Sequence, residues 1–428
     1  MSPTFASLSF YNYRVFAVGA LISNTGTWMG RVAQDWLVLT QLTNNSSVAL
    51  GIVTGLQFAP LVLLAPLAGM ITDRFAKRRI LFVTQTAMAL TALLTGVLVV
   101  TGAVQLWHIY LLAFVQGVAT ALDNPTRQTF VSEMVPRGSL SNAVGLNSAS
   151  FNAARLIGPG VAGLVIAAFT TGPAFFINAL SFVAVLLALS RMRPGELSPS
   201  PRLRGKGQIR EGIRYVRGRP DIVLIMALVF VLGTFGMNFQ MTTALMATAV
   251  FDKGAGGYGL LGSIMAVGSL SAALLSARRQ NPRLRILLVA LGAFVVASAA
   301  AALAPSYVWF AVLLIPVGLS ALTVLTTSNA MVQLSVDPAM RGRVMALYMA
   351  VFMGGTPLAS PLIGWIGSAW GPRWTILVGS ITTGLAVLGA TLYLVRSENI
   401  RVTFRRQDRP RLSLTRREVI EPVPDLTN

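Results

Sequence analysis

Long apolar stretches, separated by short segments that carry most of the charges, dominate this sequence. Of its 428 residues, 54% are hydrophobic and 11% are charged, whereas about a quarter of a soluble domain is charged. A membrane-spanning helix needs about 20 mostly apolar residues. We therefore predict an all-α membrane protein with twelve transmembrane helices. They are expected near residues 12–40, 48–72, 79–101, 107–130, 139–169, 173–191, 220–250, 258–277, 284–303, 306–334, 342–370 and 373–395.

The basic residues are distributed unevenly among the connecting segments. Four junctions contain no Lys or Arg: Asn44–Ser47, Gly102–His108, Thr170–Pro173 and Pro305–Trp309. The alternate junctions carry Arg74, Lys77, Arg78, Arg79, Arg137, a dense set from Arg191 to Arg219, Arg278 to Arg285, Arg341 and Arg343. Cytoplasmic loops are enriched in Lys and Arg. We therefore expect a multi-pass protein of the bacterial inner membrane with both termini in the cytoplasm.

A polar segment divides the chain into two apolar halves. The predicted parts are an N-terminal six-helix bundle at 1–191, a cytoplasmic linker at 192–219, a C-terminal six-helix bundle at 220–396 and a disordered cytoplasmic tail at 397–428. A weak internal repeat relates the two bundles, since Met345, Leu347 and Gly364 follow the same spacing as Val144, Leu146 and Gly163. Two repeated six-helix bundles are a known transporter architecture.

Several classes of function are disfavoured by composition. The net charge of +20 is typical of a nucleic-acid binder, but here the arginines lie in short clusters between apolar stretches, so we expect no nucleic-acid partner. The chain has no cysteine and a single histidine, His108, which disfavours disulfides and metal sites. It has no phosphate-binding Gly-Lys loop and no convergent catalytic set. We expect no enzyme activity, catalytic residue, metal or cofactor.

The junction between the second and third predicted helices reads Gly69-Met-Ile-Thr-Asp73-Arg74-Phe-Ala-Lys77-Arg78-Arg79. It resembles the signature loop of the major facilitator superfamily, Gly-x-x-x-Asp-Arg followed by a basic triplet, with Ala76 in place of the usual glycine. In that family the aspartate helps to latch the cytoplasmic side shut. The resemblance therefore implies gating roles for Asp73, Arg74 and Arg78.

Two charged residues near the cytoplasmic end of the fourth predicted helix are also candidates for gating. Asp123 and Arg127 are four residues apart and therefore share a helix face. Arg127 is in addition a candidate partner for Asp73. A structural role for the pair is the alternative.

The fifth predicted helix contains Gly158-Pro159-Gly160 followed by Gly163. This stretch resembles the Gly-Pro-x-x-Gly-Gly motif of antiporters in the same superfamily, with Ala162 replacing one glycine. Because proline lacks an amide proton, the helix can bend at Pro159, and glycines allow close helix packing. A packing kink without a mechanistic role is the alternative.

Three ionisable side chains are predicted to lie inside the membrane, where each is a functional candidate. Arg31 and Asp35 share a face of the first helix and are close enough to pair, and Arg155 lies near the middle of the fifth. Separation of Arg31 from Asp35 would let the carboxylate take up a proton, so these three are our candidates for proton coupling. The alternatives are a fixed ion pair at the outer surface and, for Arg155, a contact with an anionic substrate or a structural role.

Polar, aromatic and Met side chains within the apolar stretches are candidates for lining a substrate cavity. We select Asn24, Trp28, Asn152, Asn238 and Met241, the last because Met adapts to varied apolar surfaces. Other polar residues inside the spans, Gln85 and Gln240 among them, are weaker candidates, because the sequence does not show which face they occupy.

The chain as a whole resembles the drug- and siderophore-exporting branch of the superfamily, the branch that includes the enterobactin exporter. The matching residues are Ser23 to Trp28, Arg31 to Trp36, Asp73-Arg74, Asn124 to Arg127 and Gly158-Pro159. The resemblance implies a monomeric secondary active exporter of amphipathic small molecules, whose partners are the substrate, protons and the lipid bilayer. A dedicated siderophore exporter, an uncoupled facilitator and a lysolipid flippase on the same scaffold are the alternatives.

Overall fold

The structure, a computed structural model, describes residues 3–198, 208–277, 282–337, 340–397, 401–405 and 411–415. Nearly all of these residues are helical, as expected where backbone polar groups must find partners within their own segment. Ten helices in the described ranges are long and apolar enough to cross a membrane. The segments at 11–42 and 47–74 complete the twelve predicted spans; the first is more polar because it carries Arg31 and Asp35.

The amino half consists of η1 (Pro3–Ser9), α1 (Tyr11–Trp36), η2 (Leu37–Leu42), α2 (Ser47–Leu63), α3 (Ala65–Arg74), α4 (Lys77–Val100), α5 (Leu106–Met134), η3 (Arg137–Ser139), α6 (Leu140–Phe169) and α7 (Thr171–Arg191). A short connection follows with η4 (Pro194–Glu196) and α8 (Gln208–Arg217). The carboxy half consists of α9 (Pro220–Val231), η5 (Leu232–Gly236), α10 (Phe239–Leu245), η6 (Met246–Val250), α11 (Ala255–Ala277), α12 (Leu284–Ala302), α13 (Tyr307–Ser335), α14 (Arg341–Gly354), α15 (Thr356–Trp370) and α16 (Pro372–Ser397).

Three of the predicted spans are interrupted, each where proline or glycine weakens the helix. The second span breaks at Leu64 between α2 and α3, just before Pro66. The seventh widens into the π-helical turn η5, which contains two glycines, and is not helical at Met237 and Asn238. The eleventh breaks at Gly355, two residues before Pro357. Sequence hydropathy alone gave no sign of these breaks.

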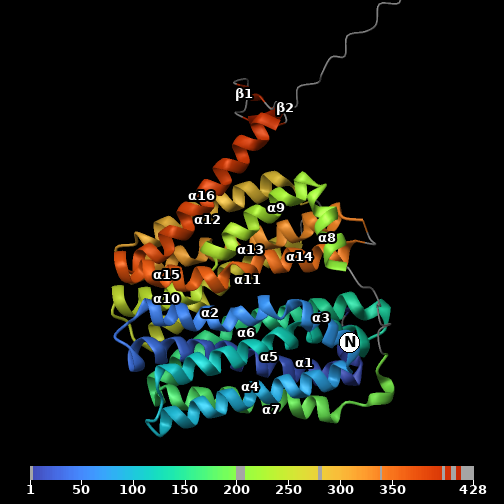
Figure 1. The fold of residues 1–428 in the computed structure, drawn as a ribbon, viewed down its shortest axis with the longest axis vertical. Coiled ribbons are helices and arrows are strands. Elements are labelled where there is room, and N and C mark those ends of the chain that lie inside the picture. The colour runs from blue at the N-terminus through green and yellow to red at the C-terminus, as the bar shows by residue number, and fades with distance from the viewer. Residues whose placement is uncertain are drawn as a thin grey trace, which may run out of the picture.

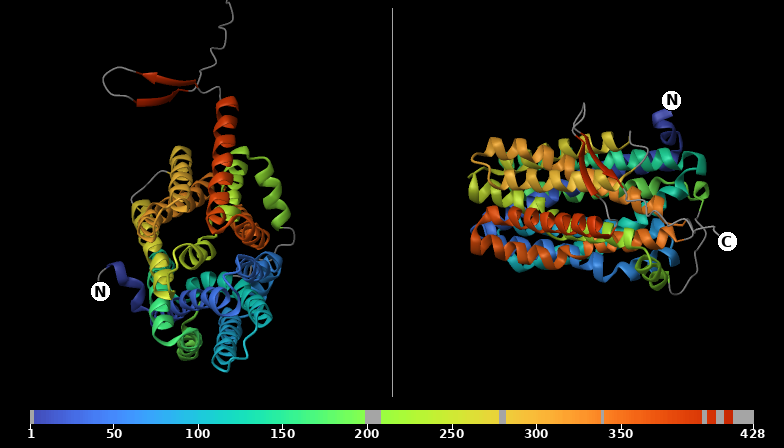
Figure 2. Two further views of the ribbon diagram at one scale, coloured as in Figure 1. Left: turned by 90° about the vertical axis from the view of Figure 1, so that its left-hand side faces the viewer. Right: turned by 90° about the horizontal axis from the view of Figure 1, so that it is seen from above.

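The helices of each half pack mainly against one another, and the two halves lie side by side (Figures 1 and 2). In Figure 2, left, the helices are seen end-on, with the amino half in blue to green below the carboxy half in yellow to red. Two pairs of helices make the main contacts between the halves, α2 with α15 and α6 with α11.

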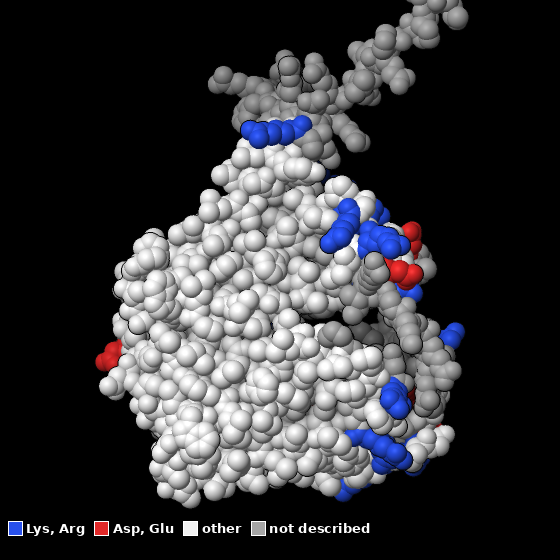
Figure 3. All heavy atoms as spheres, in the orientation of Figure 1, with Lys and Arg blue, Asp and Glu red and all other residues white. Residues whose placement is uncertain are grey.

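These contacts between the halves are concentrated at one end of the bundle. The Ser47 hydroxyl donates to the carbonyl of Gly364 at 2.7 Å, and the Ser263 hydroxyl donates to the carbonyl of Leu156 at 2.8 Å. This is the end formed by the junctions without Lys or Arg, and we call it the arginine-poor end. At the opposite, arginine-rich end, Figure 3 shows a hollow between the halves beside the exposed Lys and Arg side chains.

The connection between the halves contains the amphipathic helix α8, which packs on α14 and α9. Arg343 of α14 pairs with Glu211 of α8 at 2.6 Å, and the Tyr215 hydroxyl donates to Asp337 at 3.2 Å. The tail predicted to be disordered differs from that prediction at β1 (Arg401–Arg405) and β2 (Arg411–Thr415), which form an antiparallel pair. Apolar and polar residues alternate in both strands, a β-strand pattern. The rest of 398–428 lies outside the described residues.

Candidate functional site

Two arginines lie over the ring of Trp28 of α1. The Arg31 Cζ lies 5.2 Å from the centroid of the Trp28 ring, and the Arg155 Cζ lies 5.5 Å from it. Phe151, one turn before Arg155 on α6, meets the same indole edge-on at 5.9 Å between ring centroids. Cations over an aromatic face are attracted by its negative potential. The sequence candidates Trp28, Arg31 and Arg155 therefore form one cluster where α1 packs against α6.

Asp35, near the end of α1, connects the amino half to the carboxy half. Only 5% of its surface is exposed. Its Oδ2 accepts a hydrogen bond from the Tyr258 hydroxyl of α11 at 2.8 Å and another from Nε2 of Gln240 of α10 at 2.9 Å. Both donors lie more than 200 residues away in the sequence. Because the carboxylate is on one half and its donors are on the other, these hydrogen bonds must break when the halves separate at this point.

The predicted ion pair between Arg31 and Asp35 is not formed. The ion pairs closer than 4 Å among the described residues do not include these two. The helical spacing of four residues brings both side chains to one face, but it does not fix their directions. The guanidinium lies over Trp28, while the carboxylate points to Tyr258 and Gln240.

A cavity of about 480 Å³, a volume that includes space open to solvent, lies next to this cluster. Both halves contribute to its walls. The lining residues are Trp28, Val32, Arg155, Pro159, Phe239, Gln240, Thr243, Tyr258, Gly262, Met265 and Ala266. Mostly apolar walls with a few polar groups are typical of small-molecule sites. Gln240 and Tyr258 both line this cavity and bind Asp35, so a molecule in the cavity can compete for the partners of the carboxylate.

Four of the five cavity candidates do not line this cavity. Asn24 lies one turn before Trp28, and the side-chain amide of Asn152 donates to Ser148 on its own helix. Asn238 lines a separate space of about 200 Å³ inside the carboxy half and accepts a hydrogen bond from Ser360. Met241 is 1% exposed in the core. The face that each residue occupies depends on how its helix packs and, for Asn238 and Met241, on where the seventh span breaks.

The glycines around Pro159 allow α6 to approach two other helices closely. A Cβ at Gly158 would lie 2.5 Å from the Trp28 Cβ of α1. A Cβ at Gly163 would lie 2.9 Å from the Ala255 carbonyl of α11, and one at Gly160 would lie 3.1 Å from the Ser263 hydroxyl. The helix itself runs unbroken from Leu140 to Phe169 through Pro159. These glycines thus let α6 pack closely both against α1 in its own half and against α11 in the other half.

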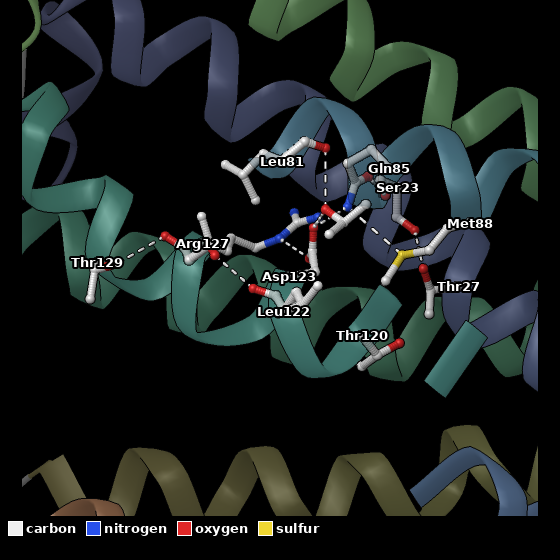
Figure 4. Close-up of polar contacts among 12 residues, drawn as sticks. Ser23, Thr27, Leu81, Gln85, Met88, Thr120, Leu122, Asp123, Arg127 and Thr129 are labelled. Atoms are coloured by element: carbon white, nitrogen blue, oxygen red, sulfur yellow. Dashed lines mark hydrogen bonds and ion pairs between the residues drawn. The ribbon is translucent and has the colours of Figure 1, made fainter. Parts of the chain in front are cut away.

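Asp123 and Arg127 belong to a buried network inside the amino half (Figure 4). Asp123 accepts hydrogen bonds from Thr84 at 2.8 Å and from Gln85 at 2.7 Å, both on α4, and from Nε of Arg127 at 3.1 Å. Arg127 also lies over the Phe16 ring of α1, 5.8 Å from its centroid. Since these contacts join α1, α4 and α5 within one half, they stabilise that half and do not join the two halves.

The remaining gating candidates lie at the arginine-rich end. Arg78 donates from Nε to the carbonyl of Leu189 at 2.8 Å and from Nη2 to that of Ser190 at 3.3 Å, so it caps the last turn of α7. Arg74 is exposed and lies over Phe75. The side chain of Asp73 is outside the described residues. Arg127, its proposed partner, is bound by Asp123.

Sequence reasoning missed the most informative residue of the site, Tyr258. A tyrosine at the start of an apolar helix is not unusual and carries no sequence signal of a polar contact. Gln240 was visible as a polar residue in an apolar span, but nothing indicated that it faces α1. The contacts of both with Asp35 arise only when α10 and α11 pack against α1.

Comparisons with known proteins agree with this architecture. A family model described as transmembrane secretion effector matches residues 2–415. The staphyloferrin A transporter of Staphylococcus aureus is 33% identical over 166 residues, which cover 38% of this chain and 41% of that protein. The multidrug efflux pump Tap of Mycolicibacterium fortuitum is 26% identical over 376 residues, which cover 85% of this chain and 90% of that pump.

The fold is also similar to solved structures of transporters. A bacterial homolog of the human lysosomal transporter Spinster, in an inward-facing and unoccupied conformation, superposes with a TM-score of 0.72 at 15% identity. That match covers 92% of this chain and 97% of the Spinster homolog. A POT family transporter superposes with a TM-score of 0.70 at 12% identity, covering 90% of this chain and 98% of that transporter. At these identities the likeness concerns the fold.

Proposed function

Because this multi-pass membrane protein belongs to the transmembrane secretion effector family of major facilitator superfamily transporters, we propose that it is a secondary active exporter of amphipathic small molecules, driven by proton antiport. The observation that carries the proposal is the position of Asp35. It is the carboxylate that is buried between the halves and bound by both Tyr258 and Gln240.

In this proposal Asp35 acts as a latch. An ionised carboxylate accepts charge-assisted hydrogen bonds, which are stronger than neutral ones. The bonds to Tyr258 and Gln240 therefore hold the halves together at the arginine-poor end while Asp35 is deprotonated and the cavity is empty. Such a latch prevents an empty carrier from reorienting, and an exchanger needs this to avoid dissipating its gradient.

Substrate would release the latch by competition. Gln240 and Tyr258 face both the cavity and Asp35, so a substrate that takes their hydrogen bonds leaves the carboxylate without its donors. The halves then separate at the arginine-poor end, substrate leaves, and Asp35 takes up a proton from that side. Protonated Asp35 carries no charge, so it can be buried again between the halves although its hydrogen bonds are weaker. The halves then close at the arginine-poor end, and Asp35 releases its proton toward the arginine-rich end.

The orientation follows from the distribution of charge. Loops rich in Lys and Arg face the cytoplasm, so the arginine-rich end and both termini are assigned to the cytoplasm of a bacterial inner-membrane protein. The hollow between the halves at that end (Figure 3) then faces the cytoplasm. Alternating access would consist of rocking the two halves about the cavity, within a monomer.

Everted membrane vesicles provide the test. Respiration acidifies their lumen, and an exporter then accumulates fluorescent probe there in exchange for protons. We would follow ethidium as an amphipathic cation and pyrenesulfonate as an amphipathic anion. The expected result is accumulation of at least one probe that collapses when nigericin and valinomycin dissipate the gradient.

Asp35→Asn keeps the shape of the side chain and removes its titration. This variant should lose gradient-driven accumulation but retain exchange of labelled for unlabelled probe. Asp252→Asn is the matched control, because Asp252 is exposed at the same end and its positive φ of 49° is tolerated by Asn. Probe movement that ignores both the gradient and Asp35→Asn would contradict proton antiport and favour an uncoupled facilitator.

A further inference from the structure

The two arginines beside Trp28 make no direct ion pair with a carboxylate. Among the described residues, Arg31 and Arg155 form no ion pair within 4 Å. Both lie over the Trp28 ring, and Arg31 is also close enough to Asp35 for the two charges to attract each other. A cation–π contact compensates only part of the hydration that a guanidinium loses on burial. Arg155, which lines the cavity, therefore retains unused donors there, and the charge of Arg31 lies close to Arg155.

The acidic groups nearest in the fold are already engaged elsewhere. Asp35 directs its bonded oxygen to Tyr258 and Gln240, and Asp123 is bound within the α4–α5 network. The lining of the cavity contains Arg155 but neither Asp nor Glu. This part of the protein therefore presents an excess of positive charge to whatever enters.

The rest of the cavity is suited to an apolar group. Phe239 and Met265 of the carboxy half face it together with Val32 and Pro159 of the amino half. The polar groups that line it from the carboxy half include Gln240 and Tyr258, and both already donate to a carboxylate, that of Asp35. Their hydrogen bonds to Asp35 thus show that Gln240 and Tyr258 can donate to a carboxylate.

We infer that the substrate is an amphipathic organic anion whose carboxylate binds Arg155 beside Trp28, with the positive charge of Arg31 nearby and the apolar part of the substrate against Phe239 and Met265. Guanidinium groups bind carboxylates with paired hydrogen bonds, and a planar apolar group stacks readily beside an indole. This inference rests on the proposed export function and names its substrate class. Export of cations by the same site is the competing outcome.

Binding to the purified full-length protein in nanodiscs tests the charge preference directly. Three probes share one skeleton: pyrenebutyrate is anionic, pyrenebutanamide is neutral and pyrenebutylamine is cationic. Binding of each is followed by pyrene fluorescence polarisation. The expected order of affinity is carboxylate, amide, amine, with at least a tenfold difference between the first and the last. Equal or tighter binding of the amine, or binding of none of the three, would overturn the inference.

Variants then locate the preference. Arg155→Gln and Arg31→Gln should each weaken pyrenebutyrate about tenfold and leave pyrenebutanamide unchanged, and Arg155→Lys should retain part of the affinity. Arg217→Gln is the matched control, because Arg217 is exposed on α8 away from the cavity. Equal weakening of all three probes by Arg155→Gln would indicate a merely structural arginine. If a Gln variant does not fold, the order in which the wild-type protein binds the three probes decides whether the site prefers an anion.

This experiment separates the inference from the proposed function. Carboxylate-selective binding by a protein that shows no gradient-driven transport would support the anion site and refute proton-coupled export. Gradient-driven transport of ethidium without carboxylate-selective binding would support the export function and refute the anion site.

Discussion

The hydroxyl of Tyr258 offers the sharpest test of how the two halves are held together. Tyr258→Phe removes one of the two hydrogen bonds that Asp35 accepts across the halves and leaves the ring in place. Tyr258 is 2% exposed, and its hydroxyl is one of the two donors to the carboxylate from the other half. The variant should therefore shift the equilibrium toward separation of the halves at the arginine-poor end.

The size of the shift follows from the charge of the acceptor. A hydrogen bond to an ionised group contributes about 1.5–3 kcal/mol, and 1.4 kcal/mol corresponds to a factor of ten in an equilibrium constant. Loss of the 2.8 Å bond from Tyr258 should thus favour the separated state by roughly 10- to 100-fold. The additional change Gln240→Ala should increase the shift, because Asp35 then loses its second donor as well.

Spin-label distances measure this equilibrium. The chain has no cysteine, so cysteines can be introduced singly on an otherwise unchanged background. Asn44→Cys in the amino half and Leu303→Cys in the carboxy half are exposed positions at the arginine-poor end. Double electron–electron resonance of the labelled pair in nanodiscs should show a longer-distance population that grows in Tyr258→Phe.

Tyr307→Phe is the matched control. Its hydroxyl donates to the carbonyl of Gly257 at 2.8 Å, so the lost bond has similar length and lies near the same end. Both partners belong to the carboxy half, and the acceptor is neutral. The distances should therefore stay at their wild-type values. Equal shifts in the two variants, or no shift in Tyr258→Phe, would refute the latch.

Two further predictions concern packing. Asp123→Asn leaves the buried guanidinium of Arg127 without its counter-ion, which should cost about 3–5 kcal/mol and lower the apparent melting temperature in detergent. The control Glu196→Gln removes a charge from an exposed pair and should leave the melting temperature unchanged. Equal effects of the two variants would contradict a buried network. Gly163→Ala places a methyl group against the backbone of α11, whereas the methyl group of Gly145→Ala on the same helix meets nothing within 4 Å. Only Gly163→Ala should lengthen the spin-label distances. Equal lengthening in both variants would rule out contact with α11 as the cause.

The twelve spans were accessible from the sequence because hydropathy is a local property. A block of about 20 apolar residues must cross the bilayer whatever its neighbours do. The interruptions at Leu64 and Gly355 were not predicted, because hydropathy responds little to the backbone effects of proline and glycine.

The sequence by itself placed Arg31, Asp35 and Arg155 within apolar stretches, which predicts ionisable groups inside the membrane. Only the tertiary structure decided what these groups bind. Helical spacing suggested that Arg31 pairs with Asp35, but the packing of α6 and α11 against α1 gave the arginine to Trp28 and the carboxylate to Tyr258. The physical reason is that spacing along a helix fixes which side chains share a face, whereas the direction of each depends on the partners that distant segments bring to it.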